Sequence, residues 1–216
     1  MLASLMRWLR RRRVAVLKPF GPVPPGTLRV TVGDRSEEVA DRLARHFHAV
    51  PGVEVVQGDL LDLDADALVS PANSFGDMGG GIDKAIDDFH GGEAQRRVRA
   101  AIEERFLGEL PVGAALVVEM PSQRFPFLVC APTMRVPGPV AGTLNAYLAM
   151  RAACVAALLD GRIRSLAVPG LCTGVGAMPA DRAAEQMRAA YDSTVGGGWR
   201  EARHPALAPF ALEGAR

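Results

Sequence analysis

The sequence predicts an α/β protein of three layers, in which helices cover both faces of a central mixed, mostly parallel sheet. Short apolar runs typical of buried strands alternate along the chain with longer segments of helical periodicity. This alternation favours a parallel sheet, because parallel strands need a crossover between them and the crossover is usually a helix. A chain of 216 residues is long enough for one such domain with peripheral segments.

The expected elements follow one another along the middle of the chain. Strands are expected at residues 28–32, 53–56, 67–70, 114–120, 127–131 and 165–168. Helices are expected at residues 37–48, 82–89, 93–106, 143–159 and 180–191. Asp34 and Ser36 are both candidates for the N-cap of the first helix, because each offers a side-chain oxygen to the first N–H groups.

The two ends of the chain differ from this middle part. Residues 1–26 are predicted to be a basic N-terminal extension that ends in a proline-rich linker, and residues 27–195 the domain. Residues 196–216 are predicted to be an irregular tail, with three glycines at its start. Five arginines (Arg7 and 10–13) lie among apolar residues, a pattern that fits an amphipathic helix on an anionic surface, an unstructured extension or a nucleic-acid contact.

The composition excludes several function classes. A hydrophobic share of 49% and a charged share of 23% are typical of a globular protein, and a net charge of +1 gives no overall attraction to nucleic acid. The three cysteines are widely spaced and have no histidines at metal-ligand spacing, so neither disulfides, a metal nor another cofactor is predicted. No segment approaches the roughly 20 apolar residues that span a bilayer, and a cytoplasmic location is expected.

A loop after the third expected strand is the strongest functional signal. It reads SPANSFGDMGGGID and contains an amide (Asn73), three glycines (Gly79, Gly80 and Gly81), Ile82 and a carboxylate (Asp83). Glycines allow a ligand to approach the backbone, and the helix that follows offers unpaired N–H groups at its start. The loop therefore predicts a phosphate site. The alternatives are an Asn73 that bonds its own turn and an Asp83 that complements the helix dipole.

Two other loops also follow expected strands, where ligands bind in open α/β sheets. Asp59 and Leu60 follow the second strand; a carboxylate there could accept hydrogen bonds from a base, or could cap a turn. The loop after the last strand could wrap a diphosphate with its backbone, and it contains Cys172, Thr173, Gly174, Val175 and Gly176. A nucleophilic role for Cys172 is not favoured, because no histidine lies near it in the sequence.

Together the three loops resemble the macro domain family, whose members bind ADP-ribose. The Gly58-Asp59 pair, the stretch from Ser70 to Asp83 and the loop from Cys172 to Pro179 occur in the family's order, within a resemblance that covers residues 28–191. The sequence is most similar to a divergent bacterial-type branch. The first Asn of the family motif is Ser70 here, and the aromatic residue of the third loop is replaced by Gly176. Phe75 is a candidate to take the place of that aromatic ring.

The resemblance implies a ligand, ADP-ribose or an ADP-ribosylated protein, and a role for each loop. It assigns Asp59 to the adenine amino group, the Leu60 amide to the ring, and residues 79–82 and 173–176 to the diphosphate. Asn73 would contact the distal ribose, and Asp83 would match the acidic residue of hydrolytic members. The implied reaction is hydrolysis at the distal ribose by an ADP-ribosyl hydrolase or deacetylase. The alternative is a non-catalytic reader of ADP-ribosylated partners.

Overall fold

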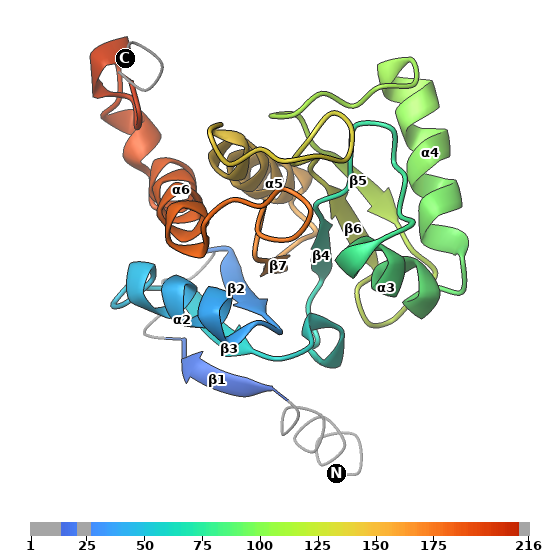
Figure 1. Cartoon of the computed structure of the whole chain (residues 1–216), viewed down its shortest axis with the longest axis horizontal. Coiled ribbons are helices and arrows are strands. Elements are labelled where there is room, and N and C mark those ends of the chain that lie inside the picture. The colour runs from blue at the N-terminus through green and yellow to red at the C-terminus, as the bar shows by residue number, and fades with distance from the viewer. Residues whose placement is uncertain (1–13, 21–26, 212–216) are drawn as a thin grey trace.

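The computed structural model describes residues 14–20 and 27–211, so the arginine-rich segment discussed above lies outside the described residues. The described chain forms a seven-stranded sheet in the order β1-β3-β2-β7-β4-β6-β5, with helices on both faces (Figure 1). The strands are β1 (Ala15–Lys18), β2 (Arg29–Asp34), β3 (Val53–Gln57), β4 (Ala67–Ser70), β5 (Leu116–Glu119), β6 (Phe127–Cys130) and β7 (Ser165–Pro169). The helices are α2 (Glu37–His46), α3 (Gly81–Phe89), α4 (Glu93–Phe106), α5 (Asn145–Asp160) and α6 (Ala180–Ser193), with short 3₁₀ turns at η1 (Leu60–Asp62), η2 (Gly198–Arg200) and η3 (Pro205–Leu207).

The five central strands are parallel and the two edge strands are antiparallel to their neighbours. β3, β2, β7, β4 and β6 run in one direction, whereas β1 pairs antiparallel with β3 and β5 pairs antiparallel with β6. This topology confirms the predicted mixed, mostly parallel sheet. Because the parallel strands share a direction, the loops at their carboxyl ends gather at one edge of the sheet.

Each face of the sheet carries its own hydrophobic core. α2, α5 and α6 cover one face, and α3 and α4 cover the other (Figure 1). The alternation of side chains along a strand divides them between the faces: Leu166 and Val168 of β7 belong to the first core, and Ala167 between them belongs to the second. Strands buried on both faces read as continuous apolar runs, which is why the sequence predicts them well.

The edge strand β1 was not predicted, because it lies in the segment assigned to the N-terminal extension. Ala15, Val16 and Leu17 form a short apolar run, but the run directly follows the arginine-rich segment and its residues are mostly exposed. Ala15 lies opposite Gln57 of β3, and Lys18 donates to the carbonyl oxygens of Val50 and Val53 at 2.7 and 2.6 Å. Part of the chain before residue 27 thus joins the sheet, while the domain boundaries as a whole remain a prediction.

The described part of the C-terminal tail, residues 196–211, is irregular apart from the turns η2 and η3, and it folds back on the last two helices. The ring of Phe210 lies 5.8 Å from that of Tyr147 on α5, and the Arg182 guanidinium of α6 lies 4.8 Å from the Phe210 ring. Among the described helices, none is both long and apolar enough to cross a membrane.

Candidate functional site

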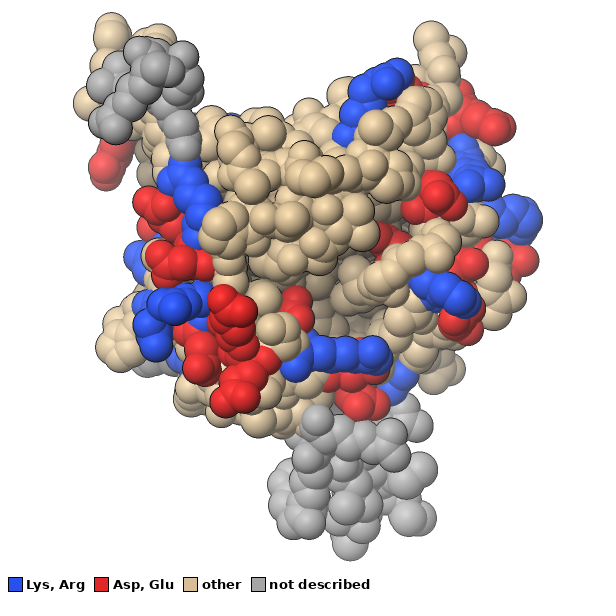
Figure 2. Space-filling view, in the orientation of Figure 1, with Lys and Arg blue, Asp and Glu red and all other residues tan. Residues whose placement is uncertain are grey.

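A cleft of about 710 Å³ lies at the carboxyl ends of all five parallel strands. Residues at or just after the ends of β2 (Asp34), β3 (Asp59), β4 (Asn73), β6 (Thr133) and β7 (Gly170) line it. Figure 2 shows this hollowed face, whose centre is largely uncharged and whose charged side chains lie around the margin. The volume falls in the range of small-molecule sites, and the position follows the rule for open α/β sheets.

The start of α3 forms one wall of the cleft. Gly80 is the N-cap, and the N–H groups of Gly81, Ile82 and Asp83 have no partner within the helix. A Cβ atom added to Gly80 or Gly81 would meet no atom within 4 Å, so open space lies in front of this backbone. Gly81 has a φ of 58°, a left-handed conformation that favours glycine. These features suit an anionic group.

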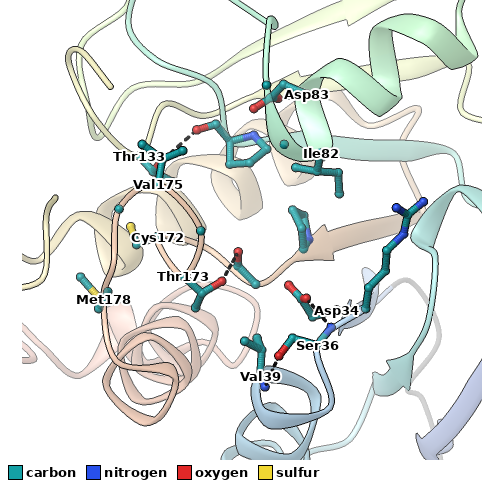
Figure 3. Close-up of a pocket in the computed structure, with 18 of the residues that line it drawn as sticks. Asp34, Ser36, Val39, Ile82, Asp83, Thr133, Cys172, Thr173, Val175 and Met178 are labelled. Carbon is teal, nitrogen blue, oxygen red and sulfur yellow. Dashed lines mark hydrogen bonds between the residues drawn. The ribbon is translucent and has the colours of Figure 1, made fainter. Parts of the chain in front are cut away.

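The loop from Thr173 to Gly176 forms the facing wall (Figure 3). Within the described chain, the backbone N–H groups of these four residues have no protein acceptor. The next two residues close the loop: Ala177 donates to the Gly174 carbonyl at 2.9 Å and Met178 donates to that of Cys172 at 3.0 Å. The free N–H groups can bind a second set of ligand oxygens across the cleft from α3.

Gly33 and Gly170 let the strand ends at the floor of the cleft lie close together. A Cβ on Gly33 would lie 2.4 Å from Val56 Cγ2, and a Cβ on Gly170 would lie 2.7 Å from Asp34 Oδ2. The Gly170 N–H donates to the Gly33 carbonyl at 3.2 Å. A larger residue at Gly33 or Gly170 would push the ends of β2, β3 and β7 apart.

Asp59 lies at the end of the cleft nearest β2 and β3. It is the N-cap of η1, where its Oδ1 accepts from the Leu61 N–H at 3.1 Å, and its Oδ2 forms an ion pair with Arg35. The turn-capping role considered for Asp59 is therefore present in the structure. Arg35 also lines the cleft, so a ligand base at Asp59 would meet both a carboxylate and a guanidinium.

Asn73 lines the cleft, but its side chain also closes its own loop. Its Oδ1 accepts from the N–H groups of Phe75 at 3.0 Å and Asp77 at 3.4 Å, and its Nδ2 donates to the Asp77 carbonyl at 3.1 Å. The turn-bonding role considered for Asn73 is thus also present. An amide nitrogen carries two hydrogens, so one remains to donate to a ligand.

Asp83 lines the opposite end of the cleft from Asp34 and Ser36 (Figure 3). Its carboxylate is buried, with 9% of the residue exposed, and accepts a hydrogen bond from Ser70 Oγ at 2.6 Å. Burial raises the pKa of Asp83 to about 7, against the opposing hydrogen bonds from Ser70 and from the Ala72 backbone, while nearby Asp77 raises it further. A carboxyl group with this pKa can exchange a proton at neutral pH.

Cys172 lies in the wall of the cleft as a buried thiol. It is 5% exposed, and burial raises the pKa of its thiol to about 12, against a hydrogen bond with Thr133. The thiolate is the nucleophilic form, so the structure agrees with the sequence in not favouring a nucleophile here. Its φ of 66° is unusual for a residue other than glycine and turns the backbone into the third loop.

Twelve of the thirteen predicted site residues line this one cleft, and Gly79 is the exception. Phe75 does not line it either; its ring packs against Arg135, whose guanidinium lies 5.4 Å away. Sequence reasoning missed Arg35, Thr133 and Pro137. Thr133 follows the expected strand at 127–131, so the strand-end rule could have found it, whereas no sequence signal marks Pro137.

The charged residues that line the cleft are mostly acidic. They are Asp34, Glu38, Asp59, Asp77 and Asp83, with Arg35 as a cation. Among the described residues, no three histidine, cysteine or acidic side chains are placed to hold a metal ion. Backbone N–H groups are therefore the main donors available to an anionic ligand in this cleft.

Comparison with known proteins identifies the family. The model of the Macro domain family matches residues 69–187, more than half of the chain, and the chain therefore belongs to the macro domain family. An uncharacterized protein of Aquifex aeolicus is 36% identical over 135 residues, which are 62% of this chain and 78% of that protein. An uncharacterized protein of Mycobacterium tuberculosis is 30% identical over 183 residues, covering 84% of this chain but 44% of the relative.

Solved macrodomain structures share the fold. The macrodomain of Mycobacterium tuberculosis DarG has a TM-score of 0.55 at 24% identity, over 63% of this chain and 88% of that one. The structure of Thermosipho africanus DarTG in complex with ADP-ribose has a TM-score of 0.55 at 19% identity, over 64% of this chain and 38% of the other. These likenesses confirm the three-layer α/β/α macro fold.

Proposed function

We propose that this protein binds ADP-ribose in the cleft and hydrolyses ADP-ribose derivatives at the distal ribose. The substrate would be an ADP-ribosylated protein, or O-acetyl or phosphorylated ADP-ribose. The observation that carries the proposal is the pair of facing walls of free N–H groups, at Gly81–Asp83 and Thr173–Gly176, between one carboxylate at Asp59 and another at Asp83. A fold shared with a protein solved in complex with ADP-ribose supports this choice of ligand.

The proposed ligand runs from the β3 end of the cleft to α3. Asp59 would accept from the adenine amino group, and the Leu60 N–H at the start of η1 would bind the ring. The diphosphate would lie between Gly80–Ile82 and Thr173–Gly176. Gly79 does not line the cleft, so we propose no contact between Gly79 and the ligand.

The distal ribose would lie beside Asn73 and Asp83. Asn73 would donate its remaining amide hydrogen to a ribose hydroxyl. With an ADP-ribosylated protein, Asp83 would orient a water molecule and take its proton as the water oxygen bonds to the ribose carbon. The bond from that carbon to the protein side chain then breaks, and the side chain leaves with the bonding electrons. The pKa of about 7 makes this carboxyl group suitable as a base near neutral pH.

A second candidate function is that of a reader, which binds ADP-ribosylated partners without turnover. The hydrogen bonds of Asn73 favour it, because three of the four bonding positions of that amide are used to hold residues 73–77. The presence of glycine at position 176, where the family has an aromatic ring, also favours it. For either function we predict a cytoplasmic location.

Titration calorimetry with ADP-ribose tests binding. We expect saturable heat with the wild-type chain and with Asp88→Ala, an exposed α3 residue outside the cleft that pairs with Lys84. Absence of heat with the wild-type chain at millimolar ADP-ribose would contradict both functions.

Turnover of an ADP-ribosylated protein separates the two functions. The proposed hydrolase releases ADP-ribose, and Asp83→Ala slows this release by 100-fold or more, in the range of a lost general base. Asp88→Ala is the matched control and should keep the wild-type rate. Tight binding without release from protein, acetyl or phosphate derivatives would select the reader, and equal rates for Asp83→Ala and wild type would exclude Asp83 as the base.

A further inference from the structure

Three buried side chains meet behind the wall of the cleft, and each comes from a different element. Ser70 ends β4 and has no exposed surface, Asp83 lies in the first turn of α3, and Cys130 ends β6 with 2% exposed. Ser70 and Cys130 are partners in the register of the parallel β4–β6 pair, so their side chains lie on the same face of the sheet. The position of Ser70 is the one at which the family motif has Asn.

The hydrogens in this group can be assigned from its chemistry. A serine hydroxyl has one hydrogen, and Ser70 Oγ lies 2.6 Å from the carboxylate oxygen Oδ1 of Asp83, which offers no hydrogen when ionised. Ser70 therefore donates to Asp83. Cys130 lies beside Ser70, because the two residues are partners in the register of β4 and β6.

No cation among the described residues balances the Asp83 charge. The side chains that face the carboxylate are Ser70 from β4, Cys130 from β6 and the like-charged Asp77 from the loop before α3, and the Ala72 backbone adds a second hydrogen bond. A buried carboxylate without a counter-ion depends on hydrogen-bond donors to remain ionised and fixed in orientation. Ser70 is the side chain that supplies such a donor.

We propose that Ser70 is a positioning residue of this site, whose hydroxyl holds the Asp83 carboxylate in its place at the wall of the cleft and stabilises its charged form. This inference rests on the proposed function, because it concerns the same site. Ser70 is buried and absent from the cleft surface, so it acts through Asp83 rather than on the ligand.

The direction of the expected effect follows from the bond that is lost. The hydroxyl of Ser70 lowers the pKa of Asp83 against the effect of burial. In Ser70→Ala the pKa of Asp83 should therefore rise above its value of about 7, and less of the carboxylate should be ionised at neutral pH. A hydrogen bond to a charged group corresponds to a shift of roughly one to two pH units. Ser70→Thr keeps the hydroxyl and should restore the wild-type midpoint.

Carbon-13 NMR of the Asp83 carboxyl group, recorded against pH on the full chain, tests this link without ligand or turnover. We expect an upward shift of the midpoint by roughly one unit or more in Ser70→Ala. Ser193→Ala is the matched control, because Ser193 is also buried but lies at the end of α6 and donates to the Ala190 carbonyl. An unchanged midpoint in folded Ser70→Ala would overturn the proposal.

Ser70→Cys provides a second variant if the alanine variant does not fold, since a thiol is a weaker donor. Its midpoint should lie above that of the wild type, and an unchanged value would again overturn the proposal. The pH dependence of ADP-ribose release should move in the same direction, with kcat affected more than KM. If the NMR midpoint shifts but ADP-ribose neither binds nor is released, the proposed function fails while the link between Ser70 and Asp83 stands.

Discussion

The Val140 N–H donates to the Gly176 carbonyl at 2.7 Å, and Val140 Cγ2 lies 2.9 Å from the place that a Cβ on Gly176 would take. The segment before α5 therefore packs against the third loop at the position where the family has an aromatic residue. A Cβ there would also lie 2.6 Å from the Cys172 carbonyl oxygen. The glycine at position 176 is thus required by the packing of this chain, and Phe75, which does not line the cleft, does not replace the aromatic ring there.

Gly176→Ala should destabilise the protein by about 1–3 kcal/mol, the usual cost of overpacking. Urea unfolding measures this loss. Adding Val140→Ala should recover only part of it, because the contact with the Cys172 carbonyl remains. Gly174→Ala is the control for stability, since a Cβ at that position meets no atom within 4 Å. Equal stability of Gly176→Ala and wild type would show that the loop can move away without cost.

Gly80→Val should remove ADP-ribose binding and leave the fold intact. Gly80 has an extended backbone (φ of −149°), which any residue can adopt, and a side chain there would project into open space in the cleft. We expect a loss of affinity of at least about tenfold by calorimetry and a loss of less than about 1 kcal/mol in stability, since glycine is only a moderate N-cap. Gly142→Val is the control, because position 142 is equally open but lies outside the cleft. Unchanged affinity in Gly80→Val would place the diphosphate elsewhere.

Asp59→Ala should weaken both the ligand site and the local structure. Loss of a hydrogen bond from the adenine amino group to a charged acceptor costs about 1.5–3 kcal/mol, or roughly 10- to 100-fold in affinity. Loss of the cap on η1 costs about 1 kcal/mol of stability, while the exposed ion pair with Arg35 adds little. Calorimetry and urea unfolding measure the two effects, with Asp88→Ala as the control. An affinity equal to that of the wild type would remove Asp59 from the proposed site.

The three cysteines should be unreactive in the folded protein. Cys130, Cys154 and Cys172 are buried as free thiols, and burial raises the pKa of each to about 12. The thiolate is the reactive species, so a chromogenic disulfide reagent at pH 8 should label none of them until urea is added, when all three should react. Rapid labelling of Cys172 in the native state would revive the nucleophile hypothesis.

The sequence predicts those parts of the fold and site that local patterns determine. Buried strands such as β7 read as apolar runs, and the glycine loops after them mark the walls of the cleft. The short apolar run of β1 does not by itself identify a strand, because its residues are mostly exposed and are held by pairing with β3. Nor can the sequence show that Val140 meets Gly176, because the order of the strands brings these two segments together, or that Ser70 meets Asp83, because that contact depends on how α3 packs against β4.

The ionisation of Asp83 should make the protein less stable as the pH rises. Its pKa is about 7 in the folded state, against an ordinary value of 3.8 in the unfolded chain. Between about pH 4 and pH 7 the folded state thus binds more protons than the unfolded state, and the free energy of unfolding falls as pH rises through this window. A shift of about three pH units corresponds to up to about 4 kcal/mol, reached once Asp83 is ionised in both states. Asp83→Asn stays neutral and keeps an oxygen that can accept from Ser70.

Urea unfolding of the wild type and Asp83→Asn at several pH values isolates this effect from the other titrating groups. Near pH 4 the buried group is neutral in both proteins, and their free energies of unfolding should be close. By pH 8 the variant should be the more stable of the two, by up to about 4 kcal/mol. Asp88→Asn, on the exposed side of α3, should follow the wild type throughout. A difference between wild type and Asp83→Asn that stays constant from pH 4 to pH 8 would mean that the Asp83 pKa is not raised by folding.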